Sequence, residues 1–263
     1  MTRATTLRRS RWAHALLESG LLAALAFACL PTQLLPSPGL VEFTEFARVP
    51  VPGGHVNAAG GNYFHERVDL ELETRLGPFA VGAVYNSSWG WTANVDVTYK
   101  NGSLRDATGA SMALGSLPAG AASPGTHWVK LDATHVKTKG GLVHEFDATT
   151  GRLSAIRYAS ASYPRLRFAQ TQLGAQWRTS AVEQCLNASA CTPLFNLAYD
   201  ANARLVRMDD HAGRTALFTY DTAGMLTSAR DGLDVAKGWP GERYEYVGSF
   251  LAAITNSEGE RLD

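Results

Sequence analysis

The 263-residue chain has no surplus of charge of either sign, because 24 lysines and arginines are matched by 24 aspartates and glutamates. Domains that bind nucleic acid carry a basic patch, so the balanced composition argues against nucleic acid as a partner. Long apolar runs are also missing near the start of the chain. The run 21–28 is far shorter than the ~20 residues that cross a bilayer, so we expect no spanning helix there.

Cysteine is scarce, with three residues in the whole chain. Cys185 and Cys191 lie six positions apart, in a stretch (181–193) predicted to be an insertion between two of the repeat units described below, and no histidines stand near them at zinc-binding spacing. In an oxidising compartment such a pair closes a small loop disulfide, whereas in a reducing one it stays as two free thiols. We expect the disulfide, and we expect no metal site.

Signatures of catalysis are missing as well. The chain has no G-x-S-x-G nucleophile elbow, its histidines are scattered, and its glycine pairs at 53–54 and 60–61 precede no helix that could cradle a phosphate. Asp69, Glu71 and Glu73 alternate, which is more typical of a solvated strand face than of paired carboxylates for glycoside hydrolysis. The sequence therefore predicts no catalytic residue, no cofactor and no enzymatic activity.

What the chain does contain is an internal repeat. Tyr199-Asp200 followed by Arg204-Leu205 returns 21 residues later as Tyr220-Asp221 followed by Met225-Leu226. A period of this size is typical of one supersecondary unit stacked on its neighbours. We count about five units in all, two of them clear. The weaker copies lie at 143–157, 166–177 and 243–254, and 259–262 resembles the opening of one more.

Each unit is predicted to be a β-hairpin. In the second copy, Asp221 enters a turn in which its carboxylate accepts main-chain N–H groups, and Gly224 takes a positive φ at no steric cost. In the first copy Ala203 stands at the glycine position, so we expect Asn202 to adopt the left-handed conformation instead. Residues 209–214 are predicted to form a second turn. The motif positions are Tyr199, Asp200, Arg204, Leu205, Gly213, Arg214, Tyr220, Asp221, Gly224 and Leu226.

The pattern Y-D-x-x-G-R-L-x-x-[IV] with a trailing G-R resembles the YD repeat, also known as the RHS repeat, from about Gly140 to the end of the sequence. The family includes bacterial Rhs and related polymorphic toxins, the cocoon subunits of Tc toxins, wall-associated repeat proteins and animal teneurins. The resemblance implies an all-β fold in which stacked hairpins form a curved or spiral sheet that encloses or displays another domain. In Rhs-type toxins the self-cleaving protease and the toxin lie beyond the repeats, so no catalytic residue carries over to this chain.

Four segments are expected along the chain. Residues 1–28 have the basic start, apolar run and small-x-small cleavage site of a signal peptide, and Cys29 directly after them is a candidate for lipidation. Residues 29–54 contain five of the eleven prolines and are predicted to be a linker without strands or helices. A pre-repeat β domain is expected over 55–138 and the repeats over 139–263. Export would place the protein outside the cell or in the cell envelope.

Strict alternation in the pre-repeat domain places Val68, Leu70 and Leu72 on one face of a predicted strand. A second strand is predicted over 79–85, a two-residue hairpin turn at 101–102 and a loop over 107–126. The order V-N-x-x-x-G-N, an acidic strand, Y-N-S and then G-W is similar to the segment that precedes YD repeats in Rhs-type proteins.

Two functions from different classes are open. The favoured one is non-enzymatic: part of an exported YD-repeat protein, as a fragment or a truncated form, that serves as a shell or display platform in toxin delivery or cell-surface interaction. The alternative is a stand-alone surface module, with or without a lipid anchor, that binds carbohydrate or protein through exposed aromatics such as Trp89, Trp91 and Tyr163. Expected partners are further YD repeats or another chain at an open C-terminal sheet edge, toxin cargo, or a surface glycan.

Overall fold

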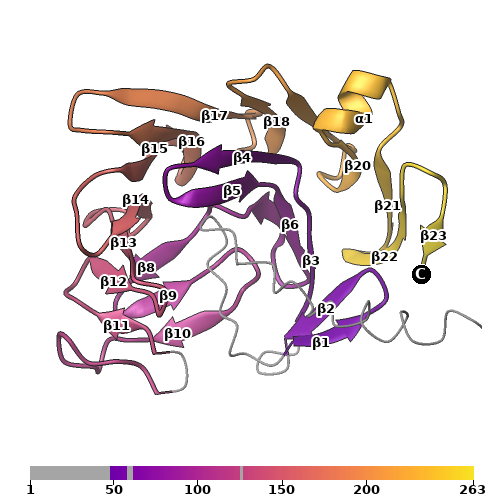
Figure 1. The fold of residues 1–263 in the computed structure, drawn as a ribbon. Helices are drawn as coiled ribbons and strands as arrows, with labels where there is room; N and C mark the ends of the chain where they lie inside the picture. Colours follow the sequence, from indigo (N-terminus) through magenta and orange to yellow (C-terminus); the bar gives the residue numbers. More distant parts are fainter. Residues whose placement is uncertain (1–47, 58–61, 125–126) are drawn as a thin grey trace, which may run out of the picture. The chain divides into compact units, whose positions relative to one another are not determined.

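A computed structural model describes residues 48–57, 62–124 and 127–263, which belong to one compact unit (Figure 1). The predicted signal peptide, the lipidation candidate Cys29 and most of the predicted linker lie outside the described residues. Strands account for 55% of the described residues and helix for 3%, so the all-β prediction is confirmed.

The larger part of the fold is one antiparallel sheet of 13 strands, which is not closed. Each strand pairs with the next one along the chain, as expected for stacked hairpins. The strands are β11 (Val129–Lys130), β12 (His135–Lys137), β13 (Leu142–Phe146), β14 (Leu153–Tyr158), β15 (Arg165–Leu173), β16 (Gln176–Cys185), β17 (Cys191–Tyr199), β18 (Leu205–Asp210), β19 (Thr215–Tyr220), β20 (Leu226–Arg230), β21 (Glu242–Val247), β22 (Phe250–Thr255) and β23 (Arg261–Leu262).

The segment before the repeats is divided among three small sheets. The first, in spatial order, contains β1 (Arg48–Val51), β2 (Gly54–Asn57), β3 (Tyr63–Glu66), β6 (Ala83–Asn86) and β7 (Gly90–Ala93). The second is the hairpin of β4 (Leu70–Thr74) and β5 (Gly77–Val81). The third contains β8 (Thr98–Lys100), β9 (Ser103–Arg105) and β10 (Ser111–Ala113).

Four hairpins of the long sheet share an irregularity at the same position of the motif. The register shifts immediately before the motif tyrosine, between Ala198 and Tyr199, and again between Thr219 and Tyr220. The same shift recurs in the weaker copies, between 145 and 146 and between 245 and 246. A β-bulge bends its strand and increases the local twist, so bulges at this position in four hairpins contribute to the curvature of the sheet.

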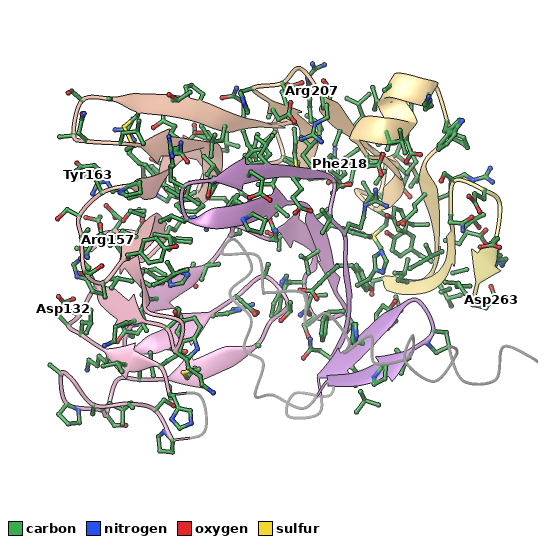
Figure 2. The ribbon with its side chains drawn as sticks, in the orientation of Figure 1. Asp132, Arg157, Tyr163, Arg207, Phe218 and Asp263 are labelled. Atoms are coloured by element: carbon green, nitrogen blue, oxygen red, sulfur yellow. A yellow bond between two sulfur atoms is a disulfide. The ribbon has the colours of Figure 1, made fainter. Side chains whose placement is uncertain are left out.

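The concave side of this curved sheet is filled by the pre-repeat segment. Figure 1 shows β4 and β5 inside the bend formed by the long sheet. Phe79 of β5 packs between Phe168 and Phe195 of the repeats, with ring centroids 6.0 Å away in each case. A single apolar cluster contains residues from both parts, including Phe218 of β19, which is labelled in Figure 2. The two parts therefore share one hydrophobic core.

Two strand predictions for the pre-repeat segment need correction. The predicted strand over 79–85 is broken at Gly82, and its halves, β5 and β6, lie in different sheets. A Cβ at Gly82 would stand 1.8 Å from the carbonyl oxygen of Arg67, so the two backbones touch there. In the predicted alternation, Leu70 is buried as expected, but Val68 precedes β4 and is 54% exposed.

Two segments predicted to lack strands contain them. Residues 48–57 form the β1–β2 hairpin, although the proline content predicted an irregular linker up to residue 54. Pro50 is tolerated because β1 is an edge strand, where a missing N–H breaks no ladder. The predicted loop over 107–126 contains β10, which pairs with β9. The predicted hairpin turn at 101–102 is present, with positive φ at Asn101 and Gly102.

Two features of the repeats were not expected. The stretch 181–193 is not an insertion, because β16 and β17 run through it and pair as far as Cys185 and Cys191. A short helix, α1 (Gly232–Lys237), stands between β20 and β21, capped by the Asp231 carboxylate. No helix in the described part of the chain is long and apolar enough to cross a membrane.

Candidate functional site

The turns of the two clear repeats are each closed by an aspartate. Asp200 Oδ1 accepts hydrogen bonds from the main-chain N–H groups of Asn202 and Arg204, both at 2.9 Å. The second turn repeats the arrangement, because Asp210 Oδ1 accepts from the N–H groups of residues 212 and 214 at 2.9 and 2.8 Å. Asp221 accepts from Met225 at 2.8 Å. The aspartates therefore satisfy turn donors that the strands leave unpaired.

The arginine four positions later binds the other carboxylate oxygen. Arg204 Nε lies 2.7 Å from Asp200 Oδ2, and Arg214 Nε lies 2.6 Å from Asp210 Oδ2. Burial would raise the pKa of Asp200, but the hydrogen bonds from Arg204 and Asn202 outweigh it and lower this pKa. The motif spacing of aspartate and arginine is thus explained by one carboxylate that binds a turn and a guanidinium at once.

In each turn, the residue three positions after the aspartate takes the left-handed conformation. Gly213 and Gly224 have φ values of 82° and 88°, and Ala203 has a φ of 58°. The expectation that Asn202 would adopt this conformation in place of Ala203 is wrong. The aspartate hydrogen bonds fix which turn position must have a positive φ, and Ala203 occupies it despite its steric cost.

The motif tyrosines connect each hairpin to the one before it. The hydroxyl of Tyr199 donates to the carbonyl of Thr179 at 2.9 Å, and that of Tyr220 donates to the carbonyl of Leu205, also at 2.9 Å. Tyr246, in a weaker copy, donates to the carbonyl of Leu226 at 2.8 Å. Two of the acceptors, Leu205 and Leu226, are themselves motif positions, so each repeat provides the acceptor for the next.

The pattern of turns and tyrosines coincides with a match to a protein-family model. Residues 199–236 match the model described as RHS Repeat. The chain therefore contains an RHS repeat. No curated relative matches the chain. RHS repeats belong to cell-surface and toxin-associated repeat proteins, and the repeat itself is generally structural rather than catalytic.

A buried ion network, which the sequence did not reveal, connects the pre-repeat segment to the RHS repeats. Arg67 donates to Asp69 Oδ1 at 2.8 Å from Nη2 and at 3.1 Å from Nε, and it also contacts Glu242 of β21. Its Nη1 lies 3.0 Å from the Tyr244 hydroxyl, which donates to Glu242 at 2.7 Å. The R-x-D and E-x-Y spacings are too common to have predicted this contact from sequence.

The pKa values of the two carboxylates in this network are shifted in opposite directions. Burial raises the pKa of Asp69, whose side chain is fully enclosed, and the nearby Arg67 charge only partly offsets this. Glu242 is less buried, so hydrogen bonds from His65 and Tyr244 and the charge of Arg67 outweigh burial and lower its pKa to about 2. The expectation that Asp69 shares a solvated face with the exposed Glu71 and Glu73 is therefore wrong for Asp69.

The three aromatic residues that the sequence offered as binding candidates occupy different environments. Trp91 packs against Tyr244 at 4.8 Å and donates from Nε1 to the Tyr246 hydroxyl at 2.9 Å, so it belongs to the contact with the RHS repeats. Tyr163 lies at the margin of the ribbon in Figure 2, beneath the guanidinium of Arg165. Trp89 is 42% exposed.

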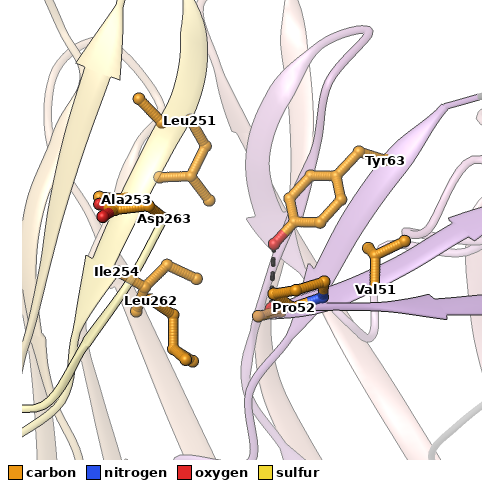
Figure 3. Close-up of a pocket in the computed structure, with 10 residues that line it drawn as sticks. Val51, Pro52, Tyr63, Leu251, Ala253, Ile254, Leu262 and Asp263 are labelled. Atoms are coloured by element: carbon orange, nitrogen blue, oxygen red, sulfur yellow. Dashed lines mark hydrogen bonds between the residues drawn. The ribbon is translucent and has the colours of Figure 1, made fainter.

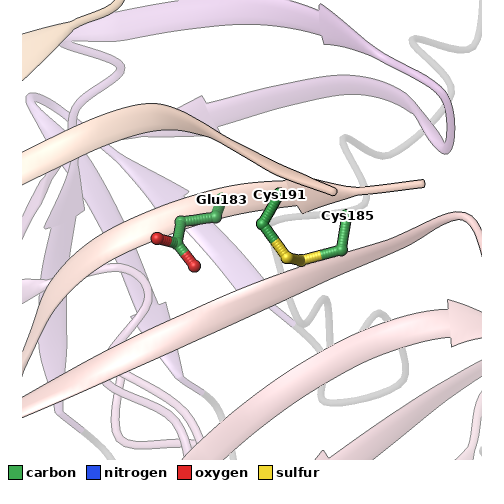
Figure 4. Close-up of side chains that lie close together, drawn as sticks. All are labelled: Glu183, Cys185 and Cys191. Carbon is green, nitrogen blue, oxygen red and sulfur yellow. A yellow bond between two sulfur atoms is a disulfide. The ribbon is translucent and has the colours of Figure 1, made fainter. Parts of the chain in front are cut away.

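The cysteine pair forms the expected disulfide, Cys185–Cys191, at the end of the β16–β17 hairpin. Glu183 lies beside it, and the three side chains have a spacing that could hold a metal ion (Figure 4). Sulfurs joined in a disulfide are not thiolates and do not bind metal, and the Glu183 carboxylate is paired with Arg167. This cluster therefore does not fit a metal ion.

Proposed function

We propose that this RHS-repeat chain is a non-enzymatic scaffold of an exported protein, in which a curved sheet is wound on its own N-terminal segment. The observation that carries the proposal is the use of the motif side chains. The aspartates and arginines close turns, and the tyrosines connect hairpins. The polar groups of the motif therefore form hydrogen bonds that stabilise the fold itself. Such a sheet serves as a shell or display platform in toxin delivery or cell-surface interaction.

The end of the sheet at β23 supports growth of the scaffold by strand addition. Among the described strands, β23 pairs with β22 alone, so its outer edge presents unpaired main-chain groups. Leu262 on this edge strand is apolar and 50% exposed. A further antiparallel strand would satisfy the main-chain groups of the edge and contact this side chain.

A hollow beside this edge would be covered by the same strand. It has a volume of about 270 Å³ and lies between the β1–β2 hairpin and β22–β23 (Figure 3). Tyr63, which donates from its hydroxyl to the carbonyl of Gly53 at 2.9 Å, forms one side, and Ile254 and Leu262 form the other. A further repeat hairpin that paired with this edge would bury the apolar lining of the hollow.

Sedimentation of the purified chain over a wide concentration range tests this proposal, because other copies are then the only strands available to the edge. We expect reversible association, weakened at least about tenfold by Leu262→Lys, since a charge at a strand edge opposes pairing. Leu233→Lys is the matched control, because Leu233 is 54% exposed on α1, away from the edge. A chain that stays monomeric at every concentration, or equal effects of both substitutions, would refute strand addition at β23.

Export is the second part of the proposal. It is supported by the disulfide, which persists in oxidising compartments, and by the signal-like residues 1–28. Mass spectrometry of the protein recovered from the producing cells gives its N-terminus. We expect a chain that starts at Cys29, with or without lipid on that residue, and a retained residue 1 would contradict export through this signal.

A further inference from the structure

The disulfide lies on the outer face of the long sheet, beside a guanidinium. In β15 Leu166 is fully buried in the shared core, so the adjacent Arg165 points to the opposite face. The register places Arg165 directly opposite Cys185, and Cys185 directly opposite Cys191. Directly opposite residues of an antiparallel pair share a face, with Cβ atoms about 4.5–5.5 Å apart. Arg165 and the disulfide are therefore neighbours on the outer face.

The β16–β17 hairpin is closed by hydrogen bonds as well as by the disulfide. The N–H of Leu186 donates to the carbonyl of Ala190 at 2.9 Å. Asn187 Oδ1 accepts from the N–H groups of residues 189 and 190 at 3.0 and 2.8 Å. A disulfide across six positions also closes a small loop, and small loops restrict the unfolded chain least. We therefore expect the hairpin to keep its structure when the bond opens.

The two sulfurs of the disulfide differ in access. Cys185 is 0% exposed, whereas Cys191 is partly exposed and is bordered by the exposed residues 186–190 and 192–193. Thiol–disulfide exchange begins when a thiolate attacks one of the two sulfurs and the other departs. A thiolate from solution therefore reaches Cys191, and Cys185 is the sulfur that leaves.

The charge next to Cys185 favours its departure as a thiolate. Arg165 Nε is buried and donates to no acceptor among the described residues. Arg165 Nη1 lies 3.7 Å from Glu145, but that carboxylate also accepts a hydrogen bond from Arg157 Nε at 2.5 Å. Because two guanidinium groups share one carboxylate, a positive charge remains uncompensated on this part of the outer face.

The carboxylate nearest to the disulfide does not cancel this charge. Glu183 lies within 4.8 Å of both sulfurs (Figure 4) and on its own would repel a thiolate. Its carboxylate accepts a hydrogen bond from Arg167 Nε at 2.5 Å, and Arg167 is directly opposite it in the register. This pair is neutral overall, so the surplus positive charge of the neighbouring arginines acts on the disulfide.

We propose that the disulfide is an exchange site for low-molecular-weight thiols, which become joined to Cys191. The sulfur of the incoming thiolate forms a bond to Cys191 Sγ, the Cys185–Cys191 bond breaks, and Cys185 leaves with the electron pair as a thiolate beside Arg165. A cation beside a thiol lowers its pKa, and a thiol of lower pKa leaves faster. One disulfide replaces another, so the step needs no oxidant or reductant and is compatible with an oxidising compartment.

The exchange is independent of strand addition, because it uses β15–β17 and not the β23 edge. Its test is incubation of the folded full chain with excess reduced glutathione, followed by acid quenching at intervals and mass spectrometry of the chain and its peptides. We expect opening at a rate proportional to the glutathione concentration, with glutathione first on Cys191, and an unchanged near-ultraviolet circular dichroism spectrum. A rate independent of glutathione, first attachment to Cys185, or loss of the folded spectrum would overturn the proposal.

Substitutions test the part played by the cation. Arg165→Gln should slow the opening at least about fivefold, because the departing thiolate loses its cation. Arg165→Lys keeps the charge and should stay within about twofold of the natural chain. Arg207→Gln is the matched control, because it removes a guanidinium from β18 and should change the rate less than about twofold. Equal rates for Arg165→Gln and Arg207→Gln, or failure of Arg165→Lys to restore the rate, would contradict the proposal.

Discussion

The pre-repeat segment and the repeats are both made of short antiparallel strands, but different kinds of contact determine their structures. In the repeats every strand of the long sheet pairs with its neighbour along the chain, and the turns are closed by residues at most four positions apart. In the pre-repeat segment β3 pairs with β6, past an intervening hairpin, and Arg67 reaches Tyr244 across 177 positions. Contacts between residues close in sequence specify the repeats, whereas the order of the pre-repeat segment depends on its contacts with the repeats.

This difference predicts that substitutions in the two parts have unequal effects on stability. Removal of a local hydrogen bond from one turn leaves the neighbouring hairpins intact, as in other repeat proteins, whose stability is nearly a sum over units and their interfaces. Disruption of the packing between the two parts instead exposes a core that both of them share.

The largest effect is expected for Arg67→Gln. It leaves the enclosed Asp69 carboxylate without its cation, and loss of one partner of a buried pair costs about 3–5 kcal/mol. Chemical denaturation measures the change in the free energy of unfolding. Arg207→Gln is the control, since Arg207 binds Asp209 with two similar hydrogen bonds but in solvent. Similar losses of stability in both variants would contradict the special role of the interface between the two parts.

Acid is expected to destabilise the fold through His144. This side chain is buried against Trp128, neither ring nitrogen has a hydrogen-bond partner among the described residues, and burial lowers its pKa to about 4 from an ordinary 6.5. Between these values the unfolded chain binds a proton that the folded chain does not, so stability falls as pH falls, by up to about 3 kcal/mol below pH 4.

The His144→Phe variant isolates this contribution, because all other groups titrate equally in both proteins. We expect the difference in unfolding free energy between the variant and the natural chain to be constant above about pH 6.5 and to grow in favour of the variant towards about pH 4. Urea denaturation at a series of pH values measures it. A difference that does not change with pH would show that His144 is protonated equally in the two states.

Glycines of the two parts should respond differently to alanine. At Gly82 the new Cβ would collide with the Arg67 carbonyl, which is main chain and cannot move aside, so we expect Gly82→Ala to cost about 3 kcal/mol or more. At Gly213 nothing lies within 4 Å of the new Cβ, and only its φ of 82° is unfavourable, which costs about 1–2 kcal/mol. Thermal unfolding of both variants compares the two values. Equal losses would mean that the close approach at Gly82 relaxes.

Removal of a tyrosine hydroxyl is expected to have a smaller effect. Tyr220→Phe loses one hydrogen bond to the carbonyl of Leu205, which is worth about 1 kcal/mol, and Tyr199→Phe should lose about the same at Thr179. The double variant should lose the sum if the repeats are independent. Tyr158→Phe, at a 40% exposed tyrosine, is the control. A double loss well above the sum would show that the hairpins unfold together.

The same contrast explains how much of the structure could be predicted from sequence. The β19–β20 hairpin, its turn at Asp221 and the all-β class follow from residues close together in the chain, and local rules describe them. The break at Gly82, the burial of Asp69 and the partner of Arg67 depend on strands far away in sequence, which no periodicity encodes. The surroundings of Trp89 and Trp91 were partly predictable: both aromatics stand out in the sequence, but the arginines near them come from separate segments.

The left-handed residue of the first repeat turn gives the smallest predicted effect, and one of opposite sign. Ala203 has a φ of 58°, which is unfavourable for a residue with a Cβ. Ala203→Gly should therefore stabilise the chain by about 0.5–1 kcal/mol, after the extra flexibility of glycine in the unfolded chain is subtracted. Gly213 already has the left-handed conformation in the second turn. We therefore attribute the gain in stability to removal of the strain at Ala203 alone.

Asn202→Gly decides whether the turn position or the residue type sets this conformation. Asn202 does not have a positive φ, so glycine there adds only flexibility to the unfolded chain and should destabilise by about 0.5–1 kcal/mol. Thermal unfolding of the two variants under one condition gives both signs. Stabilisation by Asn202→Gly and destabilisation by Ala203→Gly would mean that asparagine takes the left-handed conformation in solution. The opposite result would show that the aspartate of each RHS repeat, through its hydrogen bonds two and four residues on, dictates the turn even where the sequence lacks the glycine.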